Sequence, residues 1–342
     1  MKFGIGWVIN EGVTEAIRCA KEIEKIDYEN IWLWQEPVSK NEFMIASILA
    51  LNTNKIKIGL TAESPYYRNI VVLAASTLTL DNISGGRAAI GIATGDWRVS
   101  WRAGIKIEKP VLRLKETIES LKLMFTEEKA QYKGKTISFG PIKFGWINKK
   151  RRIPIYASIL GPKMLEMAGE TADGIMMLHT PIEYLDYALA QIKKGAEKTG
   201  RNFESLDLGV HLEIFMDEDY DKALLSAKRS YLQLGYFTYL PIIWEKAGFS
   251  TEEIQLIQKD LSNIPQDIIE KIATKFAIVG TPKDCIEKIK KYEAHGIKQL
   301  QLTPIVGELE TSFYVPMWRG TFNMLEGVKY LGNKILPAFK RL

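Results

Sequence analysis

Short apolar runs alternate with longer amphipathic segments along almost the whole chain. The runs are rich in isoleucine, leucine and alanine, as buried parallel strands are, and the segments between them carry apolar residues at helical spacing. Strands are predicted at residues 3–8, 30–34, 56–62, 87–93, 153–158, 174–178, 208–215 and 299–303. Helices are predicted at residues 13–26, 43–51, 70–83, 111–125, 162–171, 182–199, 219–234 and 282–295. This α/β alternation favours a (β/α)8 TIM barrel; the alternative is an open doubly wound sheet with fewer strands.

Two stretches interrupt the alternation and predict insertions. Residues from about 129 to 152 contain turn residues throughout and predict a short hairpin. Residues from about 235 to 277 contain an aromatic run followed by two polar helices. The aromatic run is more typical of a packed helix face than of a substrate wall. A final helix at residues 322–339 is predicted to close the barrel, so we expect residues 1–342 to form a single TIM-barrel domain with these two insertions.

The composition is that of an ordinary soluble protein with a substantial core, with 46% hydrophobic and 25% charged residues. The net charge of +5 is spread along the chain, and the densest basic run, Lys149-Lys150-Arg151-Arg152, is typical of a solvated turn. Without a basic stripe, nucleic acid is not an expected partner. No export signal and no apolar run of membrane-spanning length is apparent, which predicts a cytoplasmic protein that does not associate with membranes.

The cysteines and histidines exclude some kinds of site. Cys19 and Cys285 lie far apart on helical patterns, so no disulfide framework is predicted and a reducing compartment fits. The three histidines, His179, His211 and His295, are scattered without a close His or Cys partner. A zinc site is therefore not expected, and no metal is assigned.

The most informative stretch runs from residue 56 to residue 96. Its two predicted strands end in Thr61-Ala62-Glu63-Ser64 and in Thr94-Gly95-Asp96. Ligands of parallel α/β folds bind at the carboxyl ends of strands. The sequence G-I-A-T-G-D lacks the spacing of a dinucleotide fingerprint or a P-loop. Asp96 could orient a substrate or exchange a proton there; alternatively it caps a helix.

Two other strand ends carry candidate residues. Gln35 and Glu36 follow the predicted strand at residues 30–34. Glu36 could act as an acid or base if a closed pocket raised its pKa; alternatively it is a loop carboxylate in water. After the strand at residues 153–158, Gly161-Pro162 opens a helix whose N-terminal amides would suit a phosphate group.

These motifs resemble those of the bacterial luciferase-like superfamily. G-L-T-A-E-S-P-Y-Y-R, T-L-D-N-I-S-G-G-R and G-I-A-T-G-D are most similar to its coenzyme F420-dependent branch, to which methylenetetrahydromethanopterin reductases belong, and I-P-I-Y-A-S-I-L-G-P-K-M-L-E-M extends the similarity. The resemblance implies an oxidoreductase that uses the deazaflavin F420 to transfer hydride to or from a small organic substrate, such as a methylenetetrahydromethanopterin-like one-carbon carrier. An FMN-dependent luciferase-like monooxygenase is the alternative, and a non-catalytic flavin-binding relative is the second alternative.

The resemblance also implies roles for residues. It implies a non-proline cis peptide at Thr61–Ala62 behind the cofactor ring, Asp96 and Glu36 as the catalytic residues nearest the substrate, and a homodimer. The implied cofactor-binding residues are Gln35, Thr61, Ala62, Thr94, Gly95, Trp97, Ser158, Leu160, Gly161, Pro162, His179 and Thr180. Gln35 and Glu36 depart from the acidic residue–histidine pair common in relatives. This departure argues against a sugar-phosphate dehydrogenase and keeps the non-catalytic alternative open.

Overall fold

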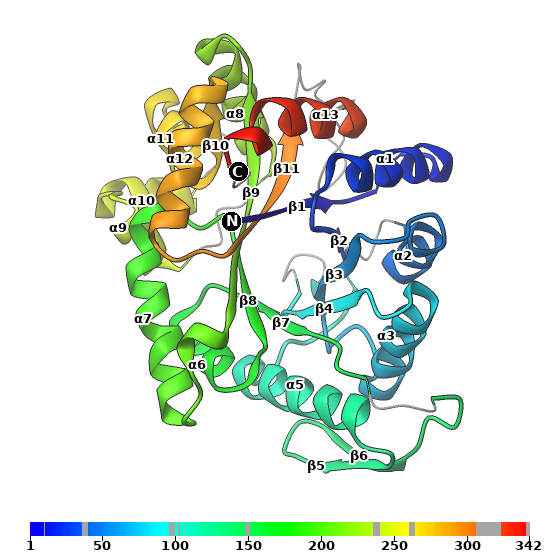
Figure 1. Ribbon diagram of the computed structural model, residues 1–342. Helices are drawn as coiled ribbons and strands as arrows, with labels where there is room; N and C mark the ends of the chain where they lie inside the picture. Colours follow the sequence, from blue (N-terminus) through cyan, green and yellow to red (C-terminus); the bar gives the residue numbers. More distant parts are fainter. Residues whose placement is uncertain are drawn as a thin grey trace.

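Eight parallel strands close into a barrel in the computed structural model (Figure 1). The structure describes residues 1–9, 11–35, 40–95, 100–101, 103–147, 151–234, 240–259, 264–305 and 323–339. In order around the barrel, the strands are β1 (Lys2–Trp7), β2 (Asn30–Trp34), β3 (Lys57–Glu63), β4 (Ala88–Ile92), β7 (Ile155–Ser158), β8 (Gly174–Leu178), β9 (Asp207–Met216) and β11 (Gln299–Ile305). Pairing of β11 with β1 and of β8 with β9 closes the ring. The predicted TIM barrel is confirmed, and the open doubly wound sheet is wrong.

Helices surround the barrel and cover the outward faces of its strands (Figure 1). They are α1 (Val13–Ile26), α2 (Glu42–Leu51), α3 (Ile70–Ser84), α5 (Pro110–Thr126), α6 (Pro162–Thr171), α7 (Ile182–Lys198), α8 (Tyr220–Leu234), α12 (Pro282–Ala294) and α13 (Met324–Lys334), and the short 3₁₀ helix η3 (Leu336–Ala338) follows α13. No helix among the described residues is long and apolar enough to cross a bilayer. Both cysteines, on α1 and α12, are buried and unpaired.

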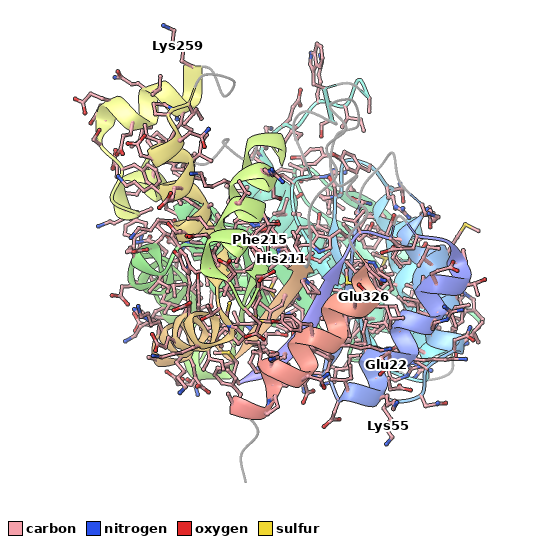
Figure 2. All side chains as sticks on the ribbon, turned by 90° about the horizontal axis from the view of Figure 1, so that it is seen from above. Glu22, Lys55, His211, Phe215, Lys259 and Glu326 are labelled. Atoms are coloured by element: carbon pink, nitrogen blue, oxygen red, sulfur yellow. The ribbon has the colours of Figure 1, made fainter. Side chains whose placement is uncertain are left out.

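Alternate strand residues divide the protein into an outer core and a barrel interior. Ile31, Ile58 and Ile90 are fully buried in the large cluster that joins strands to helices. Residues of the opposite parity face the interior, where the Trp32 ring packs edge-on against Tyr156 at 5.0 Å. On β9, His211 lies toward the middle of the molecule, in contrast to Lys259 at its periphery (Figure 2). Polar residues of interior parity can therefore meet across the barrel.

The insertion at residues 129–152 contains the predicted hairpin. Strands β5 (Ala130–Lys133) and β6 (Ser138–Ile142) pair antiparallel at the periphery (Figure 1). Residues 148–150, which include Lys149 and Lys150, lie outside the described residues. The hairpin therefore adds to the outside of the barrel without interrupting its strand order.

The insertion at residues 235–277 is helical where it is described. It contains α9 (Pro241–Lys246), α10 (Thr251–Lys259) and α11 (Gln266–Phe276). Ile243 and Trp244 are buried, and the Trp244 ring lies 4.8 Å from that of Phe276, so this end of the aromatic run is packed helix face as predicted. The earlier aromatic residues Tyr236, Phe237 and Tyr239 lie outside the described residues.

Two short elements escaped prediction. Strand β10 (Ile278–Gly280) pairs with the carboxyl end of β9, and a 3₁₀ turn, η1 (Phe203–Ser205), precedes β9. Three residues are too few to show a periodic pattern of apolar positions. The long β9 thus pairs with β8 near its start and with β10 near its end.

Candidate active site

Most of the predicted site residues lie on one rim of the barrel. The strands run parallel, so the residues that follow them converge on a single face. This rim carries Gln35 after β2, Thr61 and Ala62 on β3, Thr94 and Gly95 after β4, Ser158 on β7, Leu160, Gly161 and Pro162 at the start of α6, and His179 and Thr180 after β8. The predicted catalytic residues Glu36 and Asp96, and the predicted cofactor residue Trp97, lie outside the described residues.

Strand β3 is irregular where it reaches the rim. Its pairing with β4 shifts register between Leu60 and Glu63, and the Thr61–Ala62 peptide bond is cis. The Thr61 hydroxyl lies 2.8 Å from the Ser158 hydroxyl, and both side chains are buried. Two predicted cofactor residues from distant parts of the sequence are therefore brought together below the rim.

Gln35 joins the ends of β2 and β3. Its amide nitrogen donates to Glu63 Oε2 at 2.8 Å, and its amide oxygen accepts from the Ser64 backbone N–H at 2.9 Å. The Ser64 hydroxyl in turn donates to the Thr94 carbonyl at 2.9 Å, which extends the network to β4. The Gln35 side chain therefore makes contacts that set the positions of neighbouring strand ends.

A buried charge cluster, which the sequence did not single out, lies beside Gln35. The Arg68 guanidinium contacts the Glu42 carboxylate and lies 3.5 Å from Glu63 Oε2. Burial raises the pKa of Glu63 well above its usual range, the nearby Glu42 carboxylate raises it further, and Arg68 opposes both effects. Because two carboxylates face one cation, Glu63 is the group of this cluster that holds a proton most readily. Glu63 and Arg68 both belong to the motif A-E-S-P-Y-Y-R, so a signal was present.

A second polar network crosses the barrel interior at β8, β9 and β11. His179 Nδ1 lies 2.6 Å from Glu213 Oε2, and the rings of His179 and His211 meet edge-on with centroids 5.1 Å apart. His211 Nε2 and the Thr303 hydroxyl are hydrogen-bonded at 2.9 Å. Complete burial lowers the pKa of His211 well below its usual range, and the neighbouring His179 lowers it further. His211 is therefore neutral.

The sequence predicted only His179 of this network. Glu213 and His211 lie in the apolar run of β9, and Thr303 lies within β11. The sequence did contain a feature that indicates this network, namely polar residues at alternate positions of strands that are otherwise apolar. Such residues face a barrel interior and need partners there.

Two buried tyrosines hold the loops that follow β7 and β8. The Tyr184 hydroxyl donates to the Leu160 carbonyl, and the Tyr292 hydroxyl donates to the Thr180 carbonyl, each at 2.8 Å. Helix α6 begins at Pro162 behind Gly161, and no side chain caps its N-terminus. Uncapped amides at the start of a helix suit an anion such as phosphate.

The chemistry open to this rim is proton exchange and the binding of an organic cofactor. Among the described residues, no group of three or more His, Cys, Asp or Glu side chains could hold a metal ion. The carboxyl and imidazole groups of Glu63, His179 and Glu213 can exchange protons, whereas hydroxyls and backbone amides can bind a polar ligand.

Comparison with known proteins gives a consistent result. The sequence matches the family model described as luciferase-like monooxygenase over residues 3–299. It is 30% identical to a 5,10-methylenetetrahydromethanopterin reductase of Methanolobus tindarius, covering 88% of this chain and 93% of that one. It is 28% identical to the reductase of the same name from Archaeoglobus fulgidus, covering 99% and 100% of the two chains. The fold is similar to that of the coenzyme F420-dependent tetrahydromethanopterin reductase of Methanopyrus kandleri, with a TM-score of 0.82, 24% identity and 99% of each chain covered.

Proposed function

Since the chain belongs to the luciferase-like monooxygenase family, we propose that it is a coenzyme F420-dependent oxidoreductase. It transfers hydride to or from a small organic substrate. The observation that carries this proposal is the similarity to 5,10-methylenetetrahydromethanopterin reductases along nearly the whole chain. The same similarity makes a pterin-like one-carbon carrier the leading substrate class.

The described rim residues fit a deazaflavin with a phosphate-bearing tail. The irregular end of β3 at Thr61 and Ala62 supports one face of the ring system, and the uncapped start of α6 at Gly161 and Pro162 receives the phosphate. Ser158, Leu160, His179, Thr180, Thr94 and Gly95 complete the cofactor site with Trp97, and Gln35 fixes the strand ends around it. The bound deazaflavin supplies reversible hydride transfer at a ring carbon.

The protein residues orient the reactants and handle the accompanying proton. Buried hydrogen bonds such as Thr61–Ser158 keep the cofactor site rigid, so that little reorganisation accompanies binding. Asp96 and Glu36, which follow β4 and β2 in the sequence, are assigned to the substrate side of the ring. A carboxyl group there orients the substrate or exchanges a proton with it.

The enzyme is a cytoplasmic homodimer that contacts neither nucleic acid nor membrane. The support for a dimer is an apolar stripe on the outer face of α2 and α3, two helices that pack side by side (Figure 1). Met44 and Leu51 on α2 are 69% and 73% exposed, and Val72 on α3 is 56% exposed. Large exposed apolar residues gathered on one face are typical of a protein contact. Unpaired buried cysteines are consistent with a reducing compartment.

Titration of the purified protein with F420 and with FMN, followed by fluorescence, tests the proposal. We expect saturable F420 binding and weaker FMN binding, followed by reduction or oxidation of F420 with a reduced or oxidised one-carbon carrier. Preference for FMN, together with oxygen consumption, would instead support the monooxygenase. Binding of F420 without turnover across a panel of alcohols, aldehydes and reduced pterins would support the non-catalytic alternative.

A further inference from the structure

A buried carboxylate and an imidazole meet where β8 and β9 reach the rim. His179, the first residue after β8, has a φ of 41°, in the left-handed region that residues other than glycine rarely adopt. Its backbone N–H donates to the His211 carbonyl at 2.8 Å, and its ring nitrogen Nδ1 lies 2.6 Å from Glu213 Oε2. Both side chains are buried, with exposed fractions of 2% and 0%. The backbone of His179 is therefore fixed by the hydrogen bond to His211, and the Nδ1 atom of its ring lies against the Glu213 carboxyl group.

The surroundings of this pair favour proton exchange. A carboxyl group at one ring nitrogen of a histidine sets the orientation and tautomer of the ring, and the other ring nitrogen then carries the proton exchange. Two titratable groups of β9, Glu213 and His211, face His179. From α12, the Tyr292 hydroxyl donates to the neighbouring Thr180 carbonyl. The Glu213 carboxyl group thus contacts the imidazole from β9.

His211 takes a fixed, neutral form next to the pair. The Thr303 hydroxyl donates to the Gly6 carbonyl at 2.8 Å, so it must accept a hydrogen bond from His211 Nε2–H. Complete burial keeps the pKa of His211 well below its usual range. Gly6 also leaves space for the ring, because a Cβ at that position would lie 2.7 Å from His211 Cδ2. A neutral His211 neither competes for the proton of His179 nor repels a positive charge on it.

Glu63, another described titratable group of the rim, already has polar partners. Glu63 is bound by Gln35 and lies beside Arg68, and Gln35 itself is an amide that cannot transfer a proton. The β2 end therefore offers no imidazole, whereas the β8 end offers one that is backed by a carboxylate. This difference directs attention to His179.

We propose that His179 is an acid–base residue of the active site, in addition to Asp96 and Glu36, and that Glu213 and His211 position it. This rests on the proposed function. In the oxidative direction, a substrate carbon loses a hydride to the bound deazaflavin, and a hydroxyl or amine group on that carbon loses its proton to His179 Nε2. The C–H and O–H or N–H bonds break, and a C=O or C=N bond forms. In the reductive direction, protonated His179 returns the proton. An alcohol–carbonyl pair, an amine–imine pair, or a one-carbon carrier whose nitrogen gains the proton as its bond to the reduced carbon breaks meets this requirement.

The test compares His179→Asn and Glu213→Gln with the surface control His295→Asn. We expect Glu213→Gln and His295→Asn to bind F420 within about threefold of the parent protein, and His179→Asn, which alters the cofactor site, to bind it more weakly, so kcat is compared at saturating F420. With an alcohol or amine substrate, His179→Asn should lower kcat by about 10²–10⁴-fold, the usual contribution of a general acid or base. Glu213→Gln should lower kcat by about 10-fold or more and shift the pH–rate profile, and His295→Asn should change neither.

A second readout needs neither cofactor nor substrate. In the free protein, the NMR signals of the His179 ring nitrogens should change in Glu213→Gln, because the group 2.6 Å from Nδ1 is then an amide and no longer a carboxyl. Unchanged ring-nitrogen signals, or a pH–rate profile that survives His179→Asn, would overturn the inference. If the parent protein fails to bind F420, the proposed function is wrong, while the NMR experiment still tests the pairing. If Glu213→Gln does not fold, a second variant of the histidine, His179→Gln, is used instead to test the role of the imidazole.

Discussion

The hydroxyl groups of Thr61 and Ser158 lie 2.8 Å apart, although 97 residues separate them in the sequence. Strand β4 runs between the strands that carry them, and its Gly91 makes the contact possible. A Cβ at position 91 would lie 3.0 Å from each hydroxyl oxygen, which is tighter than nine in ten real Cβ contacts. The irregular end of β3 and the end of β7 are therefore joined across a strand whose only side chain at that level is a hydrogen atom.

We expect Ser158→Ala to destabilise the protein by about 1–3 kcal/mol. The substitution leaves the buried Thr61 hydroxyl without this partner, and an unsatisfied buried polar group costs about that much. Urea unfolding measures the loss. The control is Ser205→Ala, which removes a hydroxyl bonded to Asn202 at the exposed surface, and which should cost less than about 0.5 kcal/mol. Equal effects at the two sites would show that the Thr61–Ser158 contact does not stabilise the fold.

A double-mutant cycle separates this contact from the general cost of substitution. In the background of Thr61→Val, the additional loss caused by Ser158→Ala should be smaller than in the parent protein. The reason is that neither residue then leaves a polar group unpaired. Strictly additive losses would contradict an interaction between the two hydroxyls.

The barrel could be predicted from the sequence because its strands are apolar runs and most of them alternate with helices. Buried parallel strands and amphipathic helices leave local patterns, so the predicted ranges for β2, β8 and α1 match the observed ones. Strand β10 left no such pattern, since its three residues pair only with the end of β9.

The site could be predicted only in part, for a related reason. The rim residues follow strands and stand in motifs, so their place at the carboxyl ends was predictable. The partners of His179 and Gln35 were not, because Glu213 and Glu63 are reached through the closure of the barrel rather than along the chain. Pairing across a barrel depends on strand order and register, and the composition of a single strand determines neither.

The buried carboxyl of Glu63 should make stability depend on pH. Its pKa in the folded protein is raised above the ordinary 4.5, chiefly by burial and then by Glu42. The folded state therefore binds this proton more tightly than the unfolded state does. The stabilisation from Glu63 is fully present below pH 4.5 and is lost as the pH rises toward the raised pKa.

Glu63→Gln should remove this pH dependence. The amide cannot ionise, but its oxygen can still accept the hydrogen bond from Gln35. We expect the variant to be more stable than the parent protein by about 1 kcal/mol at pH 7.5, with the difference vanishing near pH 4.5. Urea midpoints across this range measure it, with the exposed Glu128→Gln as control. A variant less stable at every pH would mean that Glu63 is charged and stabilised by Arg68.

Removal of the Tyr292 hydroxyl should loosen the loop after β8. This hydroxyl donates to the Thr180 carbonyl at 2.8 Å, and both residues are fully buried. Tyr292→Phe leaves that carbonyl without this donor, so we expect a loss of about 1–2 kcal/mol in stability and F420 binding weaker by about 3–10-fold. Thermal unfolding and fluorescence titration measure the two effects. Tyr330→Phe, which removes a surface hydrogen bond to Glu218, should change neither. Unchanged F420 affinity in Tyr292→Phe would show that the loop after β8 does not contribute to F420 binding.

The apolar face of α2 and α3 makes a prediction about assembly. On α2, Met44, Ile48 and Leu51 recur at helical spacing on the side away from the barrel, and Val72 lies exposed on the adjacent α3. A charged group placed in such an interface must lose its hydration without gaining a partner, and this costs several kcal/mol. We therefore expect Met44→Lys and Val72→Lys to convert the dimer into monomers.

Light scattering coupled to size-exclusion chromatography tests this directly. The parent protein should have about twice the 38.8 kDa mass of one chain, and each variant should have the mass of one chain. The matched control is Val13→Lys, at a position 38% exposed on α1 and away from the stripe. It adds the same charge to an exposed valine, so it should leave the dimer intact. If the variants remain dimeric, the dimer interface lies on another face of the protein. If the parent protein is monomeric, the apolar stripe is not a dimer interface. Helix α2 follows the end of β2 beside Gln35, and α3 follows β3, which carries Glu63. An interface at these helices supports that part of the rim, so loss of the dimer should also weaken F420 binding.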